Sequence, residues 1–553
     1  MLMAHMATTS PVTVAAPKHK DFFASGMAIV WGIALAKFIV HLYFNNRYGY
    51  FRDEFDYMSC GDHLQWGYVD QPPLVPFLIH ISRAVLGDSL RAIRFIPALA
   101  SSLLVVQASA TTRLLANSEN GVPQACPEQS RTISPILRNV GSYAPILAAI
   151  CVALAPQYLS NGGLLGTNAL EPNLWLGCAQ FVILAIKQND PRYWIGFGVV
   201  AGLGMEEKYT IAVFGLGIVI GLLLTEQRRA FLNRWIWLGG LVAFLIFLPN
   251  VLWNWHYDWP FLQLIRAIRA EGRDVVWGPF EFFFQQLLEV NPVAGMVWLS
   301  GLLALLFWRP LRPYRVLGWS YLVSYTVIYL QHGKNYYLAP IYPMLFAAGA
   351  VALDALLGEF PSRRAGLKPV IAVVIAVNGF YLMPITVPVF TPDQFLAYTR
   401  TLPVKLPINE HSHARAALPQ WYADQFGWKE IADQPAVAWN RIAAAERADC
   451  GIFAQDYGQA GAIDFFGRRE GLPGAMSGDR TYWIWGPHNY SGNCMIVLDD
   501  RKEVLERYWN DVEYVGTSAP NDWALEQQIP VFICKGKKFD SWANLWPHLK
   551  RWR

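Results

Sequence analysis

Long apolar runs separated by short polar segments dominate the first 390 residues of the chain. A membrane-spanning helix needs about 20 predominantly apolar residues, and the pattern contains eleven candidates, of which the fifth and sixth are short and tightly joined. The candidates are 22–44, 91–115, 141–160, 164–186, 193–206, 209–224, 235–253, 292–308, 317–331, 338–357 and 369–390. The pattern therefore predicts a polytopic α-helical membrane domain over 22–390, with 22–44 as a retained first helix behind a polar leader at 1–21.

The basic residues of the connecting segments fall on one side of the membrane under this count. They lie before the first span and after spans two, four, six, eight and ten, at Lys18, Lys20, Arg113, Arg131, Arg138, Lys187, Arg192, Arg228, Arg229, Arg234, Arg309, Arg312, Arg315, Arg363, Arg364 and Lys368. Because Lys and Arg are enriched in cytoplasmic loops, this side is predicted to be cytoplasmic. The outer side then receives the first loop at 45–90, turns at 160–163, 206–208 and 332–337, the loop 254–291 and everything after about residue 391.

The two longest outer segments differ from the spans in composition. Loop 254–291 is rich in Trp and Phe with scattered charge, which is typical of interfacial helices. The tail 391–553 has ordinary charge density, and strand-like runs such as CGIFAQ, CMIVLDD and PVFICKG alternate with helical and Gly/Pro-rich pieces. We therefore expect a small α/β domain at 391–553. Both a disulfide and buried free thiols are compatible with Cys450, Cys494 and Cys534.

Composition supports the membrane assignment and removes other classes. The chain is 54% hydrophobic and 14% aromatic but only 16% charged, whereas a soluble domain carries about 25% charged residues. A net charge of +4, spread along the chain, gives no sign of a nucleic-acid partner. The seven cysteines form no CxxC pair, and no His, Cys and Asp cluster has the spacing of metal ligands. We expect neither a metal nor another cofactor.

Acidic and basic residues gather on the outer side. Ionisable groups at membrane depth are costly and therefore point to a functional site. A carboxylate can take a proton from an attacking hydroxyl or amine, and Lys or Arg can stabilise charge on a phosphate. A phosphate leaves without being protonated, so one carboxylate base would suffice, and direct displacement would invert the sugar carbon, unlike the paired carboxylates of glycosidases. The residues are Asp53, Glu54, Asp56, Asp70, Glu171, Glu206, Glu207, Lys208 and Lys334.

Three motifs carry a family resemblance: Arg52–Asp53–Glu54, WGYVDQPPL and KNYYLAPIYPMLFAAGA. They resemble the polyprenyl-phosphate-sugar-dependent glycosyltransferases of the GT-C superfamily, and most closely bacterial glycosyltransferase family 39, which includes the protein O-mannosyltransferases. Aminoarabinose and galacturonic acid transferases share this architecture, and the resemblance covers roughly residues 20–390. It implies a GT-C fold with about 11 transmembrane helices, outer-face juxtamembrane helices and a periplasmic C-terminal α/β domain.

The same resemblance implies a function. The protein would be an inverting transferase of the bacterial inner membrane, with its active site on the periplasmic side. It would move a sugar from a polyprenyl-phosphate donor in the bilayer to a glycolipid, polysaccharide or protein acceptor. The family's acidic base falls on Asp53, with Glu54 beside it as a second catalytic candidate.

The family's binding residues match this sequence less completely than its acidic base does. Relatives commonly carry His or Lys before the Pro-Pro pair, but here Gln71 follows Asp70. Because Gln supplies no positive charge, these two residues are expected to bind acceptor or sugar hydroxyls. Further family positions fall on Glu171, before a Pro early in span four, and on the phosphate candidates Lys208, Lys334 and, third, Arg52, with Tyr336 and Tyr337 following Lys334.

Simpler roles compete with each assignment. Asp53 or Glu54 could cap the helix that begins near Phe55, and Glu171 could form a structural ion pair with Lys208. Lys334 could extend to the interface, where Tyr336 and Tyr337 would be belt aromatics. For the whole chain, the alternatives are a membrane transporter, which would need groups near the bilayer midplane, and a non-catalytic GT-C-like subunit of envelope assembly.

Overall fold

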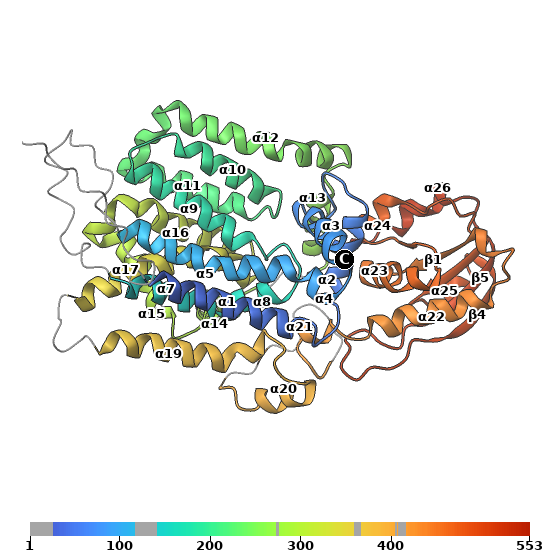
Figure 1. Cartoon of the computed structure of the whole chain (residues 1–553). Helices are drawn as coiled ribbons and strands as arrows, with labels where there is room; N and C mark the ends of the chain where they lie inside the picture. Colours follow the sequence, from blue (N-terminus) through green and yellow to red (C-terminus); the bar gives the residue numbers. More distant parts are fainter. Residues whose placement is uncertain are drawn as a thin grey trace, which may run out of the picture.

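The structure is a computed structural model that describes residues 26–116, 141–272, 276–358, 366–403, 406 and 416–552. A helical bundle forms one end of the molecule and a sheet with its helices forms the other (Figure 1). The leader at 1–21 lies outside the described residues. So do Arg131, Arg138, Arg363 and Arg364, which contributed to the predicted topology.

Each predicted span contains a helix, but the helices differ in length. Five described helical stretches are long and apolar enough to cross a membrane, at Met27–Phe44 (α1), Phe95–Ala116 (α5), Arg234–His256 (α12), Asn335–Gly358 (η4 and α17) and Leu367–Ile385 (α19 and η5). Two bent pairs raise this number to seven if each pair is one span: Tyr143–Ala153 (α7) with Pro156–Gly163 (α8), and Ile211–Leu223 (α11) with Glu226–Leu232 (η2). The count of eleven spans therefore remains a prediction.

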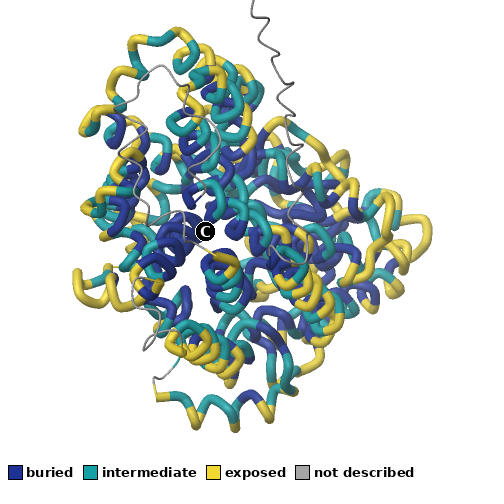
Figure 2. The backbone as a smooth tube through the Cα atoms, turned by 60° about the vertical axis from the view of Figure 1, so that its left-hand side comes forward, coloured by how far each residue is buried: buried dark blue, intermediate teal, exposed yellow. Residues whose placement is uncertain are grey.

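Shorter helices complete the bundle. They are α9 (Glu171–Lys187), α10 (Tyr193–Met205), α15 (Gly295–Phe307), η3 (Arg309–Tyr314) and α16 (Arg315–Leu330). Helix α10 packs on α12, α11 on α16 and α15 on α17. Small residues allow this close approach, since a Cβ on Gly198 of α10 would lie 2.0 Å from the carbonyl oxygen of Gly239 in α12. Buried backbone fills the centre of the bundle, and exposed positions lie along its outer helices (Figure 2).

The predicted outer turn at 160–163 is wrong. These residues belong to helix α8, and the chain instead bends by 60° at the break between Ala153 and Pro156. Proline explains the position of the bend, because Pro156 donates no backbone hydrogen bond and disfavours helical geometry at Ala155, which has an extended ψ of 128°.

The first loop forms three helices between the bundle and the sheet (Figure 1). They are α2 (Arg52–Asp62), α3 (Leu74–Leu86) and α4 (Leu90–Ile93). The loop predicted to be interfacial forms α13 (Pro260–Ala270) and α14 (Pro279–Glu289), and Phe280 and Phe284 of α14 are exposed. Exposed aromatic side chains on such short helices are consistent with contact to the bilayer surface.

A mixed five-stranded sheet follows in the C-terminal region. Its strands are β1 (Cys450–Ala454), β2 (Ala475–Ser477), β3 (Cys494–Leu498), β4 (Trp509–Thr517) and β5 (Pro530–Lys537), in the order β2-β1-β3-β5-β4. Strand β1 pairs in parallel with β2 and β3, whereas β5 is antiparallel to β3 and β4. The strand-like runs CGIFAQ, CMIVLDD and PVFICKG form β1, β3 and β5, which confirms that part of the prediction.

Short helices surround this sheet. They are α20 (Pro392–Thr399), α21 (Gln420–Ala423), α22 (Trp428–Arg441), α23 (Tyr457–Phe466), α24 (Arg480–Trp485), α25 (Lys502–Leu505) and α26 (Trp542–Leu545), with the 3-10 turns η6 (Arg447–Asp449), η7 (Gly467–Glu470) and η8 (Trp546–Leu549). A disulfide joins Cys450 to Cys494 at the start of the neighbouring strands β1 and β3, and Cys534 is a buried free thiol.

The first loop and the sheet share one hydrophobic core. Phe55, Met58 and Ile79 of the loop belong to the same buried cluster as Ile452 of β1 and Ile496 of β3. Apolar burial across this junction holds the two parts together. The junction thereby brings the acidic first-loop motif against the C-terminal region.

Candidate functional site

Glu54 is fully buried, and its carboxylate is occupied. Arg94 binds both oxygens at 2.7 Å, and the backbone N–H groups of Leu165 and Phe51 donate to them at 3.0 and 2.8 Å. These four contacts tie α2 to α4, to the segment before α9 and to its own N-terminus. The geometry therefore gives Glu54 a structural role, and its predicted catalytic role gains no support from its position.

Asp53 lies one position away and is only half-buried. The hydroxyl of Tyr457 donates a hydrogen bond of 2.5 Å to its Oδ1 atom. Tyr457 is the first residue of α23, whose N-terminus is capped by Asp456 through the N–H groups of Gly458 and Gln459. Burial raises the pKa of Tyr457 well above its ordinary value, so the phenol stays protonated and remains a donor.

Arg480 faces the same place from the start of α24. Its Nη1 atom donates to Asp70 Oδ2 at 2.5 Å, and its guanidinium lies 3.8 Å from the ring centroid of Tyr457. Its Nε atom and Asp70 Oδ1 are buried and have no hydrogen-bond partner among the described residues. The predicted hydroxyl-binding residue Asp70 is therefore paired with a cation from the C-terminal domain.

Arg52, the third phosphate candidate, is also surrounded by acids. Its guanidinium lies 3.6 Å from Asp456 and 3.5 Å from Glu526, and 4.8 Å from the ring centroid of Tyr457. Two acidic side chains already lie against this guanidinium. Arg52 therefore serves the junction between α2 and the sheet domain in this conformation.

Gln71 points back to α2 rather than to solvent. Its Nε2 atom donates to Asp56 Oδ2 at 3.2 Å, and both side chains are buried. Burial, followed by the negative charge of Asp70, raises the pKa of Asp56 well above its ordinary value. Burial also raises the pKa of Asp70, against the opposing effect of Arg480. Gln71 thus holds Asp56, one of the acidic residues of the first loop, through this hydrogen bond.

The other predicted binding residues form a second cluster. Lys208 Nζ lies 3.3 Å from Glu171 Oε2 and donates to Asn168 Oδ1. The same ammonium lies 4.6 Å from the ring centroid of Tyr337 and 5.7 Å from that of Tyr336. Lys334 Nζ lies 5.6 Å from the ring centroid of Tyr336, so two cations lie near one aromatic ring. Thr210 also donates to Glu171.

The segment 164–170 joins the two clusters. Leu165 N–H contacts Glu54, Asn168 contacts Lys208, and Leu170 N–H donates to Glu207 Oε1 at 2.8 Å. The segment therefore contacts Glu54, the chain neighbour of Asp53 in the acidic cluster of Asp53 and Asp70, and Lys208 of the basic cluster of Lys208 and Lys334. Tyr457, Arg480, Asn168 and Thr210 escaped the sequence analysis. For Tyr457 a signal existed, since it opens a helix shortly after the predicted strand CGIFAQ, which forms β1 of the parallel part of the sheet.

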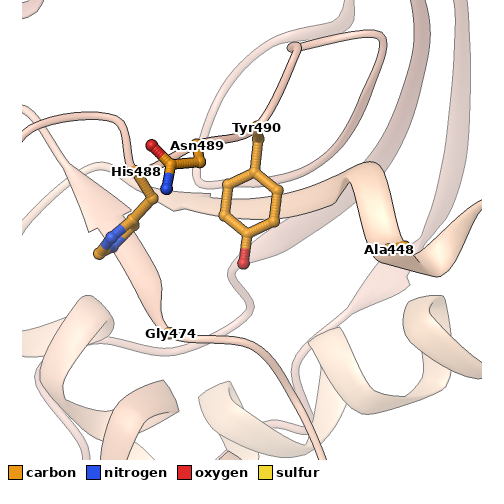
Figure 3. A pocket seen from close by; sticks show the side chains of 5 residues that line it. All are labelled: Ala448, Gly474, His488, Asn489 and Tyr490. Carbon is orange, nitrogen blue, oxygen red and sulfur yellow. The ribbon is translucent and has the colours of Figure 1, made fainter.

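A separate cavity of about 270 Å³ lies in the sheet domain and is lined by Ala448, Gly474, His488, Asn489 and Tyr490 (Figure 3). The side chains of His488, Asn489 and Tyr490 extend from one stretch of loop in this view. No predicted site residue lines it. Among the described residues no group of three or more His, Cys, Asp or Glu side chains is arranged to hold a metal ion, and the expected lack of a metal stays a prediction.

Comparison with known proteins places the fold. A family model described as dolichyl-phosphate-mannose-protein mannosyltransferase matches residues 133–253. No curated protein sequence matches the chain. The structure resembles that of ArnT from Cupriavidus metallidurans bound to undecaprenyl phosphate, with a TM-score of 0.57, 13% identity and coverage of 92% of this chain and 98% of that one. Apo ArnT gives a TM-score of 0.56 at 14% identity, with the same coverage.

At this level of identity the likeness to ArnT shows the fold. The matched proteins and the apolar helices together indicate a multi-pass membrane protein. The predicted resemblance to the GT-C glycosyltransferases is thus confirmed by the family model and by the architecture. The chain has a GT-C-like fold, mostly helical, with a small C-terminal sheet domain.

Proposed function

We propose that the protein is an integral membrane glycosyltransferase that moves a sugar from a polyprenyl-phosphate donor to an acceptor at the periplasmic face of the inner membrane. The observation that carries the proposal is the fold shared with ArnT bound to undecaprenyl phosphate, over 92% of the chain. A glycolipid, a polysaccharide and a protein are all suitable acceptors.

Asp53 is the proposed general base. Its carboxylate is half-buried and accepts a hydrogen bond from the neutral phenol of Tyr457. The carboxylate of Glu54 next to it is instead paired with Arg94. An ionised carboxylate in this position can take the proton of an attacking hydroxyl or amine. The sugar–phosphate bond breaks as the acceptor bond forms, and the configuration of the sugar carbon inverts.

The basic cluster is the proposed phosphate site. Lys208 and Lys334 can stabilise the charge of the departing polyprenyl phosphate, which needs no protonating acid. Glu171 and Asn168 hold the Lys208 ammonium in place. In-line displacement requires the base and the leaving group on opposite faces of the sugar carbon. In this proposal the acceptor binds on the side of Asp53 and the phosphate binds on the side of Lys208.

The proposal can be tested with the purified full-length protein. The measurement is the release of sugar from an undecaprenyl-phosphate-linked sugar. We expect Asp53→Asn to lower turnover by about 100-fold or more, since general bases contribute factors of about 10²–10⁴. The matched control is Asp88→Asn, which removes an exposed carboxylate of the same loop that pairs only with Arg83 in the described contacts. Equal turnover by Asp53→Asn and wild type would overturn the base. Absence of turnover in every form would favour a transporter or a non-catalytic subunit.

A further inference from the structure

The sheet domain contacts the first loop through the ends of its parallel strands. Tyr457 follows the carboxyl end of β1, and Arg480 follows that of β2. In open α/β sheets the carboxyl ends of parallel strands are where ligands and catalytic groups gather. In this protein helix α2, which carries Asp53, packs against that edge through α23 (Figure 1).

Glycines bring α23 unusually close to α2. A Cβ on Gly461 would lie 2.7 Å from Phe55 Cβ, and one on Gly458 would lie 2.8 Å from Arg52 Cγ. Real Cβ atoms do not approach other atoms so closely without displacement. The spacing of these two glycines places both on one face of α23. Tyr457, one residue before Gly458, is thereby held over Asp53.

Three consecutive residues at the start of α24 bind the first loop. The contacts join Arg480 Nη1 to Asp70 Oδ2 at 2.5 Å, the amide of Val69 to Thr481 Oγ1 at 3.2 Å, and Tyr482 Oη to Ser59 Oγ at 2.8 Å. Arg480 itself has a φ of +44°, which is rare for a side chain of its size. Such backbone conformations persist where surrounding structure enforces them, often at functional sites.

The last described residues enforce this conformation. Arg551 N–H donates to Gly478 O at 2.7 Å, and Arg480 N–H donates to Arg551 O at 3.4 Å. A Cβ on Gly478 would lie 1.9 Å from Leu549 O, so only glycine fits the close pairing. The last described residues thereby lie at the junction, where Arg551 pairs with Asp479 beside α24 and Trp552 shares a buried cluster with Val69 of the first loop. Several contacts within the sheet domain therefore fix the position of Arg480.

We propose that Tyr457 and Arg480 are positioning residues for Asp53, so that the catalytic base is assembled only when the C-terminal domain docks on the first loop. The inference rests on the proposed function of Asp53. Tyr457 fixes the orientation of the Asp53 carboxylate through its hydrogen bond. Arg480 places a positive charge beside the Tyr457 ring and among the carboxylates of the first loop.

The acidic groups around Arg480 explain why a positive charge is needed beside Asp53. The first loop and the domain edge both face Arg480 with ionisable groups. These groups are Asp53, Asp56, Tyr57, Cys60, Asp70, Tyr457 and Asp479. Carboxylates that share a poorly hydrated site repel one another, and one of them then binds a proton. With Arg480 in place, the positive charge opposes the rise in the pKa of Asp56 and Asp70. The same charge offsets the repulsion that these acidic groups exert on Asp53.

Four variants of the full-length membrane protein test the proposal by donor turnover and its pH dependence. For Tyr457→Phe we expect a kcat lowered by about 10- to 100-fold with a donor KM within twofold of wild type, as for loss of a charge-assisted hydrogen bond. The acid limb of its pH–rate profile should move toward neutral pH, because a carboxylate without its donor is more easily protonated. Arg480→Ala should behave similarly, and Arg480→Lys should recover much of the loss by restoring the charge.

Arg468→Ala is the matched control. It removes an ion pair with Asp62, of 3.1 Å, that joins the same domain to the same loop away from Asp53. It should leave kcat and the pH profile unchanged. The inference would be overturned if Asp53→Asn were inactive but Tyr457→Phe and Arg480→Ala had the kcat and pH profile of wild type.

Two further outcomes also count against it. Equal losses of undecaprenyl phosphate binding, thermal stability and turnover in both Arg480 variants would show a merely structural role. Full activity of Asp53→Asn would instead remove the proposed function, and the positioning role with it. Loss of kcat with undecaprenyl phosphate binding retained would support the inference.

Discussion

Tyr457 and Asp53, 404 positions apart in the sequence, meet through a single hydrogen bond of 2.5 Å between a phenol and a carboxylate. One residue opens α23 of the sheet domain and the other lies in the first turn of α2. This contact distinguishes Asp53 from Glu54, which the bundle side of the molecule occupies through Arg94. It also makes the C-terminal domain a part of the proposed active centre.

Replacement of Glu54 should affect folding more than chemistry. In Glu54→Gln, Arg94 loses its buried counter-charge, and breaking such a pair costs about 3–5 kcal/mol. We expect a marked drop in the thermal unfolding temperature of the detergent-purified protein, whereas Asp53→Asn should unfold close to wild type. A Glu54→Gln protein that was as stable as wild type but inactive would restore Glu54 as a catalytic residue.

Substitution of Lys208 should weaken binding of the lipid phosphate. A hydrogen bond to a charged group contributes about 1.5–3 kcal/mol, so Lys208→Met should bind undecaprenyl phosphate at least about tenfold more weakly in direct titration. Glu171→Gln keeps the ammonium and should bind within a few-fold of wild type. The control Lys429→Met removes an exposed charge of the sheet domain. Equal losses in the Lys208 and Glu171 variants would instead indicate a structural ion pair.

An added methyl group at Gly461 should separate α23 from α2. The new Cβ would meet Phe55, and overpacking of this kind costs about 1–3 kcal/mol. We expect Gly461→Ala to lower both the unfolding temperature and donor turnover, since Tyr457 moves with α23. Gly474→Ala is the control, because its Cβ would meet only Asp464 Oδ1 at 3.8 Å. Similar behaviour of the two variants would refute the close-packing argument.

The junction beside Arg52 should lose stability as the pH rises. Burial, and then the charge of Asp456, raises the pKa of Glu526 from 4.5 to about 8, while Arg52 lowers it in part. Between these two values the folded state keeps a proton that the unfolded state has released, so the free energy of unfolding falls with increasing pH. Glu526→Gln imitates the protonated form and should flatten this dependence in unfolding measurements from pH 5 to pH 8. An unchanged slope in that variant would contradict the assignment.

The disulfide should contribute substantially to the sheet domain. Cys450 and Cys494 close a loop with a sequence separation of 44, for which chain entropy predicts a stabilisation of about 4 kcal/mol. Cys450→Ser should therefore lower the unfolding temperature, and a reductant should do the same to wild type. Cys534→Ser, at a buried free thiol, should not abolish the response to reductant. A wild type insensitive to reductant would exclude this contribution.

The hydrophobic pattern by itself determined most of the architecture. A span in lipid must be long and apolar and must satisfy its own backbone, so the helices of the bundle were visible as runs in the sequence. Strands β1, β3 and β5 were visible as short apolar runs, because strands covered on both faces carry few polar residues. Strands β2 and β4 were not visible. Strand β2 has three residues, and β4, at an edge of the sheet, buries only every third position, which is not the alternation that marks a strand.

The tertiary structure alone decided how neighbouring acids divide their roles. Asp53 and Glu54 are adjacent and chemically alike, but they have different partners. Arg94 binds Glu54 and Tyr457 binds Asp53, and both partners come from distant parts of the chain. The same holds for Arg480, which lies against Asp70 although 410 positions separate them. Sequence patterns report the local period of helices and strands, whereas these pairs exist only after distant elements have packed on the first loop. The bundle side pairs Glu54 with Arg94, and the sheet domain pairs Asp53 with Tyr457. This packing leaves Glu54 buried in a structural ion pair and Asp53 half-buried as the proposed base.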